Sequence, residues 1–176
     1  MKPSFVFATL LAAVSSALAG VVSTTIIDSI DPAKWISVES GEIDHNALGT
    51  VANSTGVSLE ARGGTPVVHC YNFGTSTSRT ILVTVIDDFC NNRLIGLTAR
   101  PGVEYWSRYN YGPVTTYVSL TMTGCSPWVV DSACNINLRR PVDGCNTGGV
   151  NGKQGGWMTD DCASWRTDPG SNGSDV

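Results

Sequence analysis

Residues 114–123 read VTTYVSLTMT, and this stretch is the most direct indication of the fold class. Apolar and polar side chains alternate along it, which places one set on each face of an extended chain. The first face would carry Val114, Thr116, Val118, Leu120 and Met122, and the second Thr115, Tyr117, Ser119 and Thr121. Such a period of two is typical of a β-strand with one buried face. We therefore expect a half-buried strand here.

Three further extended segments are expected around this strand. Residues 101–111 (PGVEYWSRYNY) precede Gly112-Pro113, so they could pair with residues 114–123 as a hairpin. Residues 66–73 (PVVHCYNF) form a short apolar run, and residues 157–166 (WMTDDCASWR) are expected to be a final strand. Asp168-Pro169-Gly170 is expected to be a turn.

Two helices are expected beside the strands. Leu82, Val85, Ile86 and Phe89 repeat with helical spacing after hydroxyl residues at 75–78 that can cap a helix, and Cys90 would close the segment. The β-branched residues 80–85 favour a strand instead, so both alternatives stay open. The second helix is expected to begin at Ser126-Pro127 and to end at Pro141. The prediction is an α+β fold: a small disulfide-stapled sandwich of an antiparallel sheet with about two helices.

The chain has an even number of cysteines, all in its C-terminal two thirds: Cys70, Cys90, Cys125, Cys134, Cys145 and Cys162. In an exported protein this composition indicates a framework of three disulfide bonds, whose pairing the spacing leaves open. A zinc site is not expected, because paired CxxC spacings are missing and His69 is the one histidine nearby. We expect no metal and no cofactor.

The N-terminal third divides into two expected regions. Residues 1–19 have a positive Lys2, an apolar run and a small-residue cleavage motif, which together predict a secretory signal peptide and an extracellular location. Residues 20–62 end in Leu59-Glu60-Ala61-Arg62 before two glycines, so they are either a removable pro-segment or an attached N-terminal extension. Residues 63–176 are then the cysteine-rich α+β domain. Asn53 and Asn172 lie in N-glycosylation triplets.

Charge and hydropathy exclude several function classes. The net charge is −4, with no basic stripe, so neither a nucleic acid nor an anionic lipid surface is an expected partner. Beyond the signal, no apolar run approaches the length of a membrane span. The sequence leaves the oligomeric state open.

An enzymatic function is not expected. The chain lacks a G-x-S-x-G motif, and His69 lies beside a cysteine expected to be bridged. The carboxylates that could form a glycosidase pair are Asp87, Asp88, Glu104, Asp160 and Asp161. Acidic residues in such positions are more often capping or solvated groups, so we expect no catalytic residue.

Aromatic and amide side chains point to ligand binding. Sugars stack their apolar faces on aromatic rings, while amides and charged groups bind their hydroxyls. The glycine-rich loop 143–156 could supply some of these groups, or it could be a disulfide-pinned surface loop. The candidate ligand-binding residues are Trp106, Tyr109, Asn110, Asn151, Lys153, Gln154 and Trp157.

The C-terminal half carries a resemblance. Residues 142–149 (VDGCNTGG), residues 151–156 (NGKQGG) and the later Cys162, Trp165-Arg166 and Asp168-Pro169 resemble small cysteine-rich secreted proteins of filamentous fungi. The order of elements from Cys70 to Asp168 is similar to the Y-three-like family of mushroom glycan-binding proteins. The resemblance implies an αβα sandwich and a lectin-like role, and it extends in style to killer-toxin-like effectors.

Two functions are therefore expected from the sequence. The first is a secreted, non-enzymatic glycan-binding protein of a fungus whose partner is a carbohydrate or another cell-surface ligand. The alternative is a secreted effector or killer-toxin-like protein that acts on a host or competitor target.

Overall fold

The structure, a computed structural model, describes residues 26–27, 31, 33–47, 65–146 and 148–171. The expected signal peptide, the expected cleavage region 59–64 and the two glycosylation triplets at Asn53 and Asn172 lie outside the described residues.

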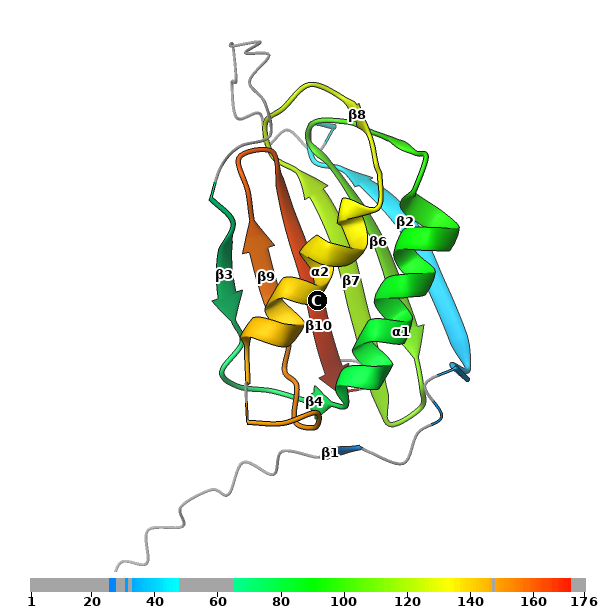
Figure 1. Cartoon of the computed structure of the whole chain (residues 1–176). Helices are drawn as coiled ribbons and strands as arrows, with labels where there is room; N and C mark the ends of the chain where they lie inside the picture. The colour runs from blue at the N-terminus through cyan, green and yellow to red at the C-terminus, as the bar shows by residue number, and fades with distance from the viewer. Residues whose placement is uncertain (1–25, 28–30, 32, 48–64, 147, 172–176) are drawn as a thin grey trace, which may run out of the picture.

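A six-stranded antiparallel sheet forms one layer of the domain (Figure 1). Its order is β2 (Ser37–Asp44), β6 (Val103–Asn110), β7 (Val114–Met122), β10 (Ala163–Ser171), β9 (Gly156–Thr159) and β3 (Val67–Cys70). Helices α1 (Arg79–Phe89) and α2 (Ala133–Gly144) form the second layer, and both lie on the same face of the sheet. The predicted α+β class is confirmed. The αβα arrangement implied by the resemblance is wrong for the described residues, because both helices cover the same face of the sheet.

Two small pairs complete the described elements. Strand β1 (Ile26–Ile27) pairs in parallel with β4 (Ser76–Thr77), and β5 (Thr98–Ala99) pairs antiparallel with β8 (Trp128–Val129).

The core lies between the sheet and the two helices. On β7 the predicted strand and its core face are confirmed, since Val114, Val118, Leu120 and Met122 belong to the buried cluster. The strand is more than half-buried, because Thr115 and Ser119 on the other face are buried as well. On α1 the residues predicted to share one helical face, Leu82, Val85, Ile86 and Phe89, are all buried. The helical alternative for residues 79–89 is thus the observed one, because burial of this continuous face outweighs the strand preference of the β-branched residues. Ser78 caps the helix by accepting a hydrogen bond from the Ile81 amide.

The end of the first helix agrees with the prediction and the boundaries of the second helix differ from it. Cys90 is the C-cap of α1, and the chain then continues as one π-helical turn, η1 (Cys90–Leu94). The second helix begins at Ala133 rather than near Pro127, because residues 128–129 pair with β5 and because Asp131 accepts a hydrogen bond from the Ala133 amide. Pro141 lies inside α2 and does not end it. A proline so close to the C-terminal end removes a single amide donor, which the remaining packing of the last turn tolerates.

The expected final strand at 157–166 is a hairpin of two strands. Asp160 makes the turn, where its carboxylate accepts hydrogen bonds from the amides of Cys162 and Ala163. The turn expected at residues 168–170 is wrong, because these residues continue β10. Pro169 fits there since β9 pairs only as far as Thr167, so β10 has one neighbour at the proline and needs no donor on its other side.

The structure has three disulfide bonds, Cys70–Cys145, Cys90–Cys134 and Cys125–Cys162, of which the first connects the sheet to the helix layer. The first joins β3 to the end of α2, and the second joins η1 to the first turn of α2. The third connects the ends of β7 and the β9–β10 turn, where the two chain segments already lie side by side. The expected framework of three bonds is therefore present, with a defined pairing.

Part of the region expected to be a pro-segment or extension belongs to the sheet. Residues 37–44 form β2, which pairs along its whole length with β6. Because the region 20–62 lacks cysteines, no disulfide bond holds this strand, and its attachment depends on backbone pairing and on side chains such as Val38 that pack on the core.

Candidate functional site

The face of the sheet away from α1 and α2 is called the open face below. Strand side chains alternate between faces, so residues that neighbour the core residues in sequence point to this side. Cross-strand register places Trp106 beside Ser119, Ser119 beside Arg166, Arg166 beside Trp157, and Trp157 beside His69. These five residues therefore form one line across β6, β7, β10, β9 and β3, about 19 Å from end to end at a strand spacing of about 4.8 Å.

Ring contacts turn this line into a continuous surface, called the aromatic row. Its members are Trp106, Tyr117, Arg166, Tyr71, Trp157 and His69. Trp106 stacks on Tyr117 with ring centroids 5.9 Å apart, and His69 stacks on Trp157 at 4.8 Å. The guanidinium of Arg166 lies 5.1 Å from the Tyr117 ring and 5.9 Å from the Tyr71 ring, and Tyr71 lies 5.4 Å from Trp157.

Glycine on the edge strand makes room for the first ring of the row. Gly41 lies opposite Trp106 in the register, and a Cβ atom at Gly41 would lie 3.1 Å from the indole ring. The indole can therefore lie against the backbone of β2. Any larger residue at position 41 would push the ring away from this place.

Hydrogen-bonding groups surround the rings. Arg166 donates to the Asp168 carboxylate at 2.5 Å, and the Tyr117 hydroxyl donates to Glu104 at 3.0 Å. Burial, reinforced by the Glu104 charge, raises the pKa of Tyr117 well above its usual range, so this hydroxyl is a neutral donor at every physiological pH. The open face thus offers carboxylate acceptors and guanidinium donors between aromatic surfaces.

Three of the residues predicted to bind a ligand lie on this face. Trp106 and Trp157 belong to the aromatic row. Asn110 follows at the end of β6 on the same face, and its side-chain oxygen accepts a hydrogen bond from the Gly112 amide. The structure therefore brings together the two tryptophans, which are 51 positions apart in the sequence.

Tyr109 lies on the other side of β6, in the core, and its side chain is 0% exposed. Its hydroxyl donates to Asp88 at 2.6 Å, and Arg93 donates to both residues. The alternation of the strand explains the difference, because neighbouring residues 109 and 110 must point to opposite faces. Tyr109 is a structural residue here and leaves the candidate site.

Replacing Asp88 by asparagine tests this buried network through pH. Burial raises the pKa of Asp88, but hydrogen bonds from Tyr109, Asn92 and Arg93 outweigh it and hold the pKa below its usual range. The folded pKa is below the unfolded pKa, so the stabilisation is complete above about pH 4 and is lost as pH falls through the folded value. Urea unfolding should show the variant less stable by about 1.5–3 kcal/mol at pH 7. The difference should shrink at pH 2.5, and a difference that stays constant between these pH values would contradict the assignment.

The predicted residues of the glycine-rich loop fall into two groups. Asn151 is exposed. Lys153 is 4% exposed and donates to the carbonyls of Cys145 and Asn146, just past the end of α2. Gln154 is half-buried and exchanges hydrogen bonds with Asn146. These hydrogen bonds hold the loop in place. Because the Lys153 side chain is buried, it cannot contact a ligand, and we remove it from the candidate site.

Four of the five carboxylates considered for catalysis are held by protein groups, and the fifth, Asp161, is exposed. Asp87 pairs with Arg139, and Asp88 is bound in the network with Tyr109. Asp160 accepts hydrogen bonds from the turn amides and from the Trp165 indole. Glu104 receives the Tyr117 hydroxyl. These contacts assign structural roles to these four side chains.

Sequence reasoning missed four residues of the row: Tyr71, Tyr117, Arg166 and His69. A signal was present for Tyr117, since the alternation of residues 114–123 puts it on the polar face of its strand. For Arg166 and Tyr71 there was no local signal, because their places depend on the order of the strands in the sheet.

Comparison with family models, with curated proteins and with solved structures finds no match for this chain. Within the described residues, no group of three or more His, Cys, Asp or Glu side chains could hold a metal ion. The two helices described here lack the combination of length and apolar character that crossing a bilayer requires.

Proposed function

We propose that the protein is a secreted lectin that binds an oligosaccharide along the aromatic row of the open face. The observation that carries the proposal is the line of half-buried rings from Trp106 to Trp157, with carboxylates and a guanidinium between them. Aromatic rings and fixed polar groups in alternation suit the two kinds of surface that a sugar presents.

The length and the charge of the row favour a neutral oligosaccharide. A row of about 19 Å spans several strands, which gives room for more than one sugar ring. Its cation Arg166 is paired with Asp168, so the row offers no net positive charge of its own to an anionic ligand. The ligand class also agrees with the resemblance of the 142–156 block to fungal glycan-binding proteins.

An extracellular site of action belongs to the same proposal. The three disulfide bonds are compatible with an oxidising compartment, and the N-terminal pattern of the sequence predicts export. In that compartment the accessible ligands are glycans of cell surfaces and cell walls.

The test is a glycan array followed by titration of the best glycan with two variants, Trp106→Ala and Trp157→Ala. Each variant removes one ring from the row and is expected to weaken binding about tenfold, equivalent to about 1.4 kcal/mol. Tryptophan fluorescence of the wild type should change on binding, because both indoles would be covered by the ligand.

Ile136→Ala is the matched control. This side chain is 60% exposed on α2, in the layer on the opposite side of the sheet, so its loss should leave the affinity unchanged. A protein that binds no glycan at millimolar concentration would refute the proposal. Equal weakening by the control and the two tryptophan variants would also refute it, since the open face would then not be the binding surface.

A further inference from the structure

We propose that the outer edge of β2, with the pocket beside it, binds an extended peptide that carries basic residues and one apolar side chain. The peptide would add a strand next to β2 and place its apolar side chain in the pocket. The pocket lies on the helix side of the sheet, whereas the aromatic row lies on the open face, and the two share Trp106, which also lines the pocket.

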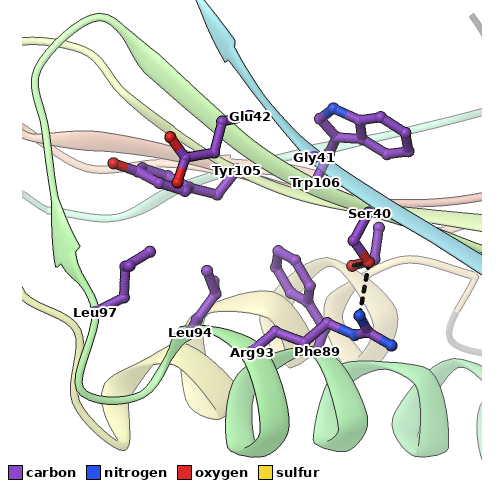
Figure 2. Close-up of a pocket in the computed structure, with 10 residues that line it drawn as sticks. Ser40, Gly41, Glu42, Phe89, Arg93, Leu94, Leu97, Tyr105 and Trp106 are labelled. Atoms are coloured by element: carbon purple, nitrogen blue, oxygen red, sulfur yellow. Dashed lines mark hydrogen bonds between the residues drawn. The ribbon is translucent and has the colours of Figure 1, made fainter.

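The pocket has a volume of about 230 Å³ and lies between the edge of the sheet and the end of the first helix (Figure 2). Its floor is apolar and is formed by Phe89, Leu94 and Leu97, with the Tyr105 ring on the opposite side. The π-helical turn places Leu94 and Arg93 at the pocket, and such turns occur frequently at functional sites. An apolar side chain would find matching surface here.

Polar groups stand at the rim of the pocket. Arg93 donates to the Ser40 hydroxyl at 2.8 Å, and Ser40 and Ser107 share a hydrogen bond of the same length. Glu42 lies at the other end, where it pairs with Arg100. Ser40 and Glu42 are both exposed, so the rim is reached from the side of the edge strand.

Strand β2 offers the backbone that such a peptide needs. It is eight residues long and pairs with β6 on one side, and the structure describes no strand on its other side. An edge strand presents unpaired amide and carbonyl groups that can template another strand. In peptide recognition of this kind, main-chain hydrogen bonds supply affinity, and a neighbouring pocket for alternate side chains supplies specificity.

The charge of β2 selects the occupant. The strand sequence SVESGEID contains three acidic residues, Glu39, Glu42 and Asp44, and no basic one. Glu42 already pairs with Arg100, so the charges that a peptide would meet are those of Glu39 and Asp44. A second copy of the chain paired along this edge would bring acidic side chains opposite acidic side chains, which destabilises a strand pair. A peptide with lysine or arginine in those positions would instead gain favourable cross-strand pairs. We therefore commit to a basic peptide rather than to a homodimer.

The experiment uses the folded, disulfide-bonded protein and a labelled peptide, acetyl-Lys-Thr-Lys-Leu-Thr-Val-Lys-amide, in a fluorescence anisotropy titration. Two matched peptides are compared with it: one has glutamate in place of each lysine, and one has N-methyl groups on alternate amides. Each change should weaken binding at least tenfold, the first through charge and the second through loss of main-chain hydrogen bonds. Hydrogen exchange at residues 37–44 should slow when the parent peptide is bound.

Two protein variants test the pocket. Ser40→Phe places a ring at the rim and should weaken peptide binding at least tenfold. Ser37→Phe adds the same ring to the same strand but on the open face, and should leave binding unchanged. Both positions are exposed, and circular dichroism verifies the fold of each variant.

Three results would overturn the proposal: no binding of the parent peptide at millimolar concentration, equal binding of the N-methylated peptide, or equal effects of the two variants. Added glycan should not displace the peptide. The proposed peptide site and the proposed glycan site are therefore tested by separate measurements.

Discussion

Replacing Cys90 and Cys134 together by alanine is expected to lower the free energy of unfolding by about 4 kcal/mol. The bond closes a separation of 44 residues, and the entropy that it removes from the unfolded chain accounts for this amount. Both cysteines are 0% exposed, so small cavities add to the loss. Reversible urea unfolding, followed by tryptophan fluorescence, measures the difference.

The pair Cys125 and Cys162 is the matched control, because its separation of 37 residues gives a similar entropic term. Cys125 is half-buried, so alanine at these two positions should leave less empty space and cost less than the first replacement. A larger effect for the control pair would contradict this account of the core. The unreduced wild type should also take up no alkylating groups, since all six cysteines are bonded within the described residues.

Replacing Lys153 by methionine is expected to cost about 2–4 kcal/mol, although the residue lies in a glycine-rich loop. The ammonium group donates to the Cys145 and Asn146 carbonyls at 3.2 Å and 2.9 Å. Methionine keeps the apolar stem and removes the donor, so two acceptors at the negative end of α2 lose their partner. Urea unfolding at neutral pH measures the change.

Lys34→Met is the control for this replacement. The Lys34 side chain is 80% exposed and pairs with Asp31 on the surface, so its removal should change stability by less than about 1 kcal/mol. If Lys153→Met unfolded like the wild type but lost glycan binding, Lys153 would return to the binding site. If both variants behaved alike, the buried lysine would have no special structural role.

Local sequence patterns predicted which segments form helices and strands, but they predicted the first and last residues of these elements less well. The buried face of α1 and the core face of β7 follow from spacing within a dozen residues, and both are observed. The predicted boundaries were wrong where pairing with a strand from a distant part of the sequence sets them. Residues 128–129 pair with β5, so α2 begins only after them. Strand β9 pairs with β10 only as far as Thr167, so β10 can contain Pro169 beyond that point.

The candidate site divides in the same way. Trp106 and Trp157 were found because sugar chemistry favours tryptophan, and the structure places both on the open face. Tyr109 and Lys153 were chosen by the same chemistry, yet both are buried. Residue type alone does not show whether an aromatic ring or an ammonium group is exposed and available to a ligand or buried in contact with the rest of the protein.

The sequence by itself determined the class of the fold, because the periodicity of apolar side chains shows which face of each helix or strand is buried. It also determined that the described cysteines could be fully paired, because their number is even. The order of the six strands was decided only in the tertiary structure. That order places Trp106, Arg166 and Trp157 in one line. Local sequence patterns do not encode the strand order, because which strands become neighbours depends on how all the elements together bury one core.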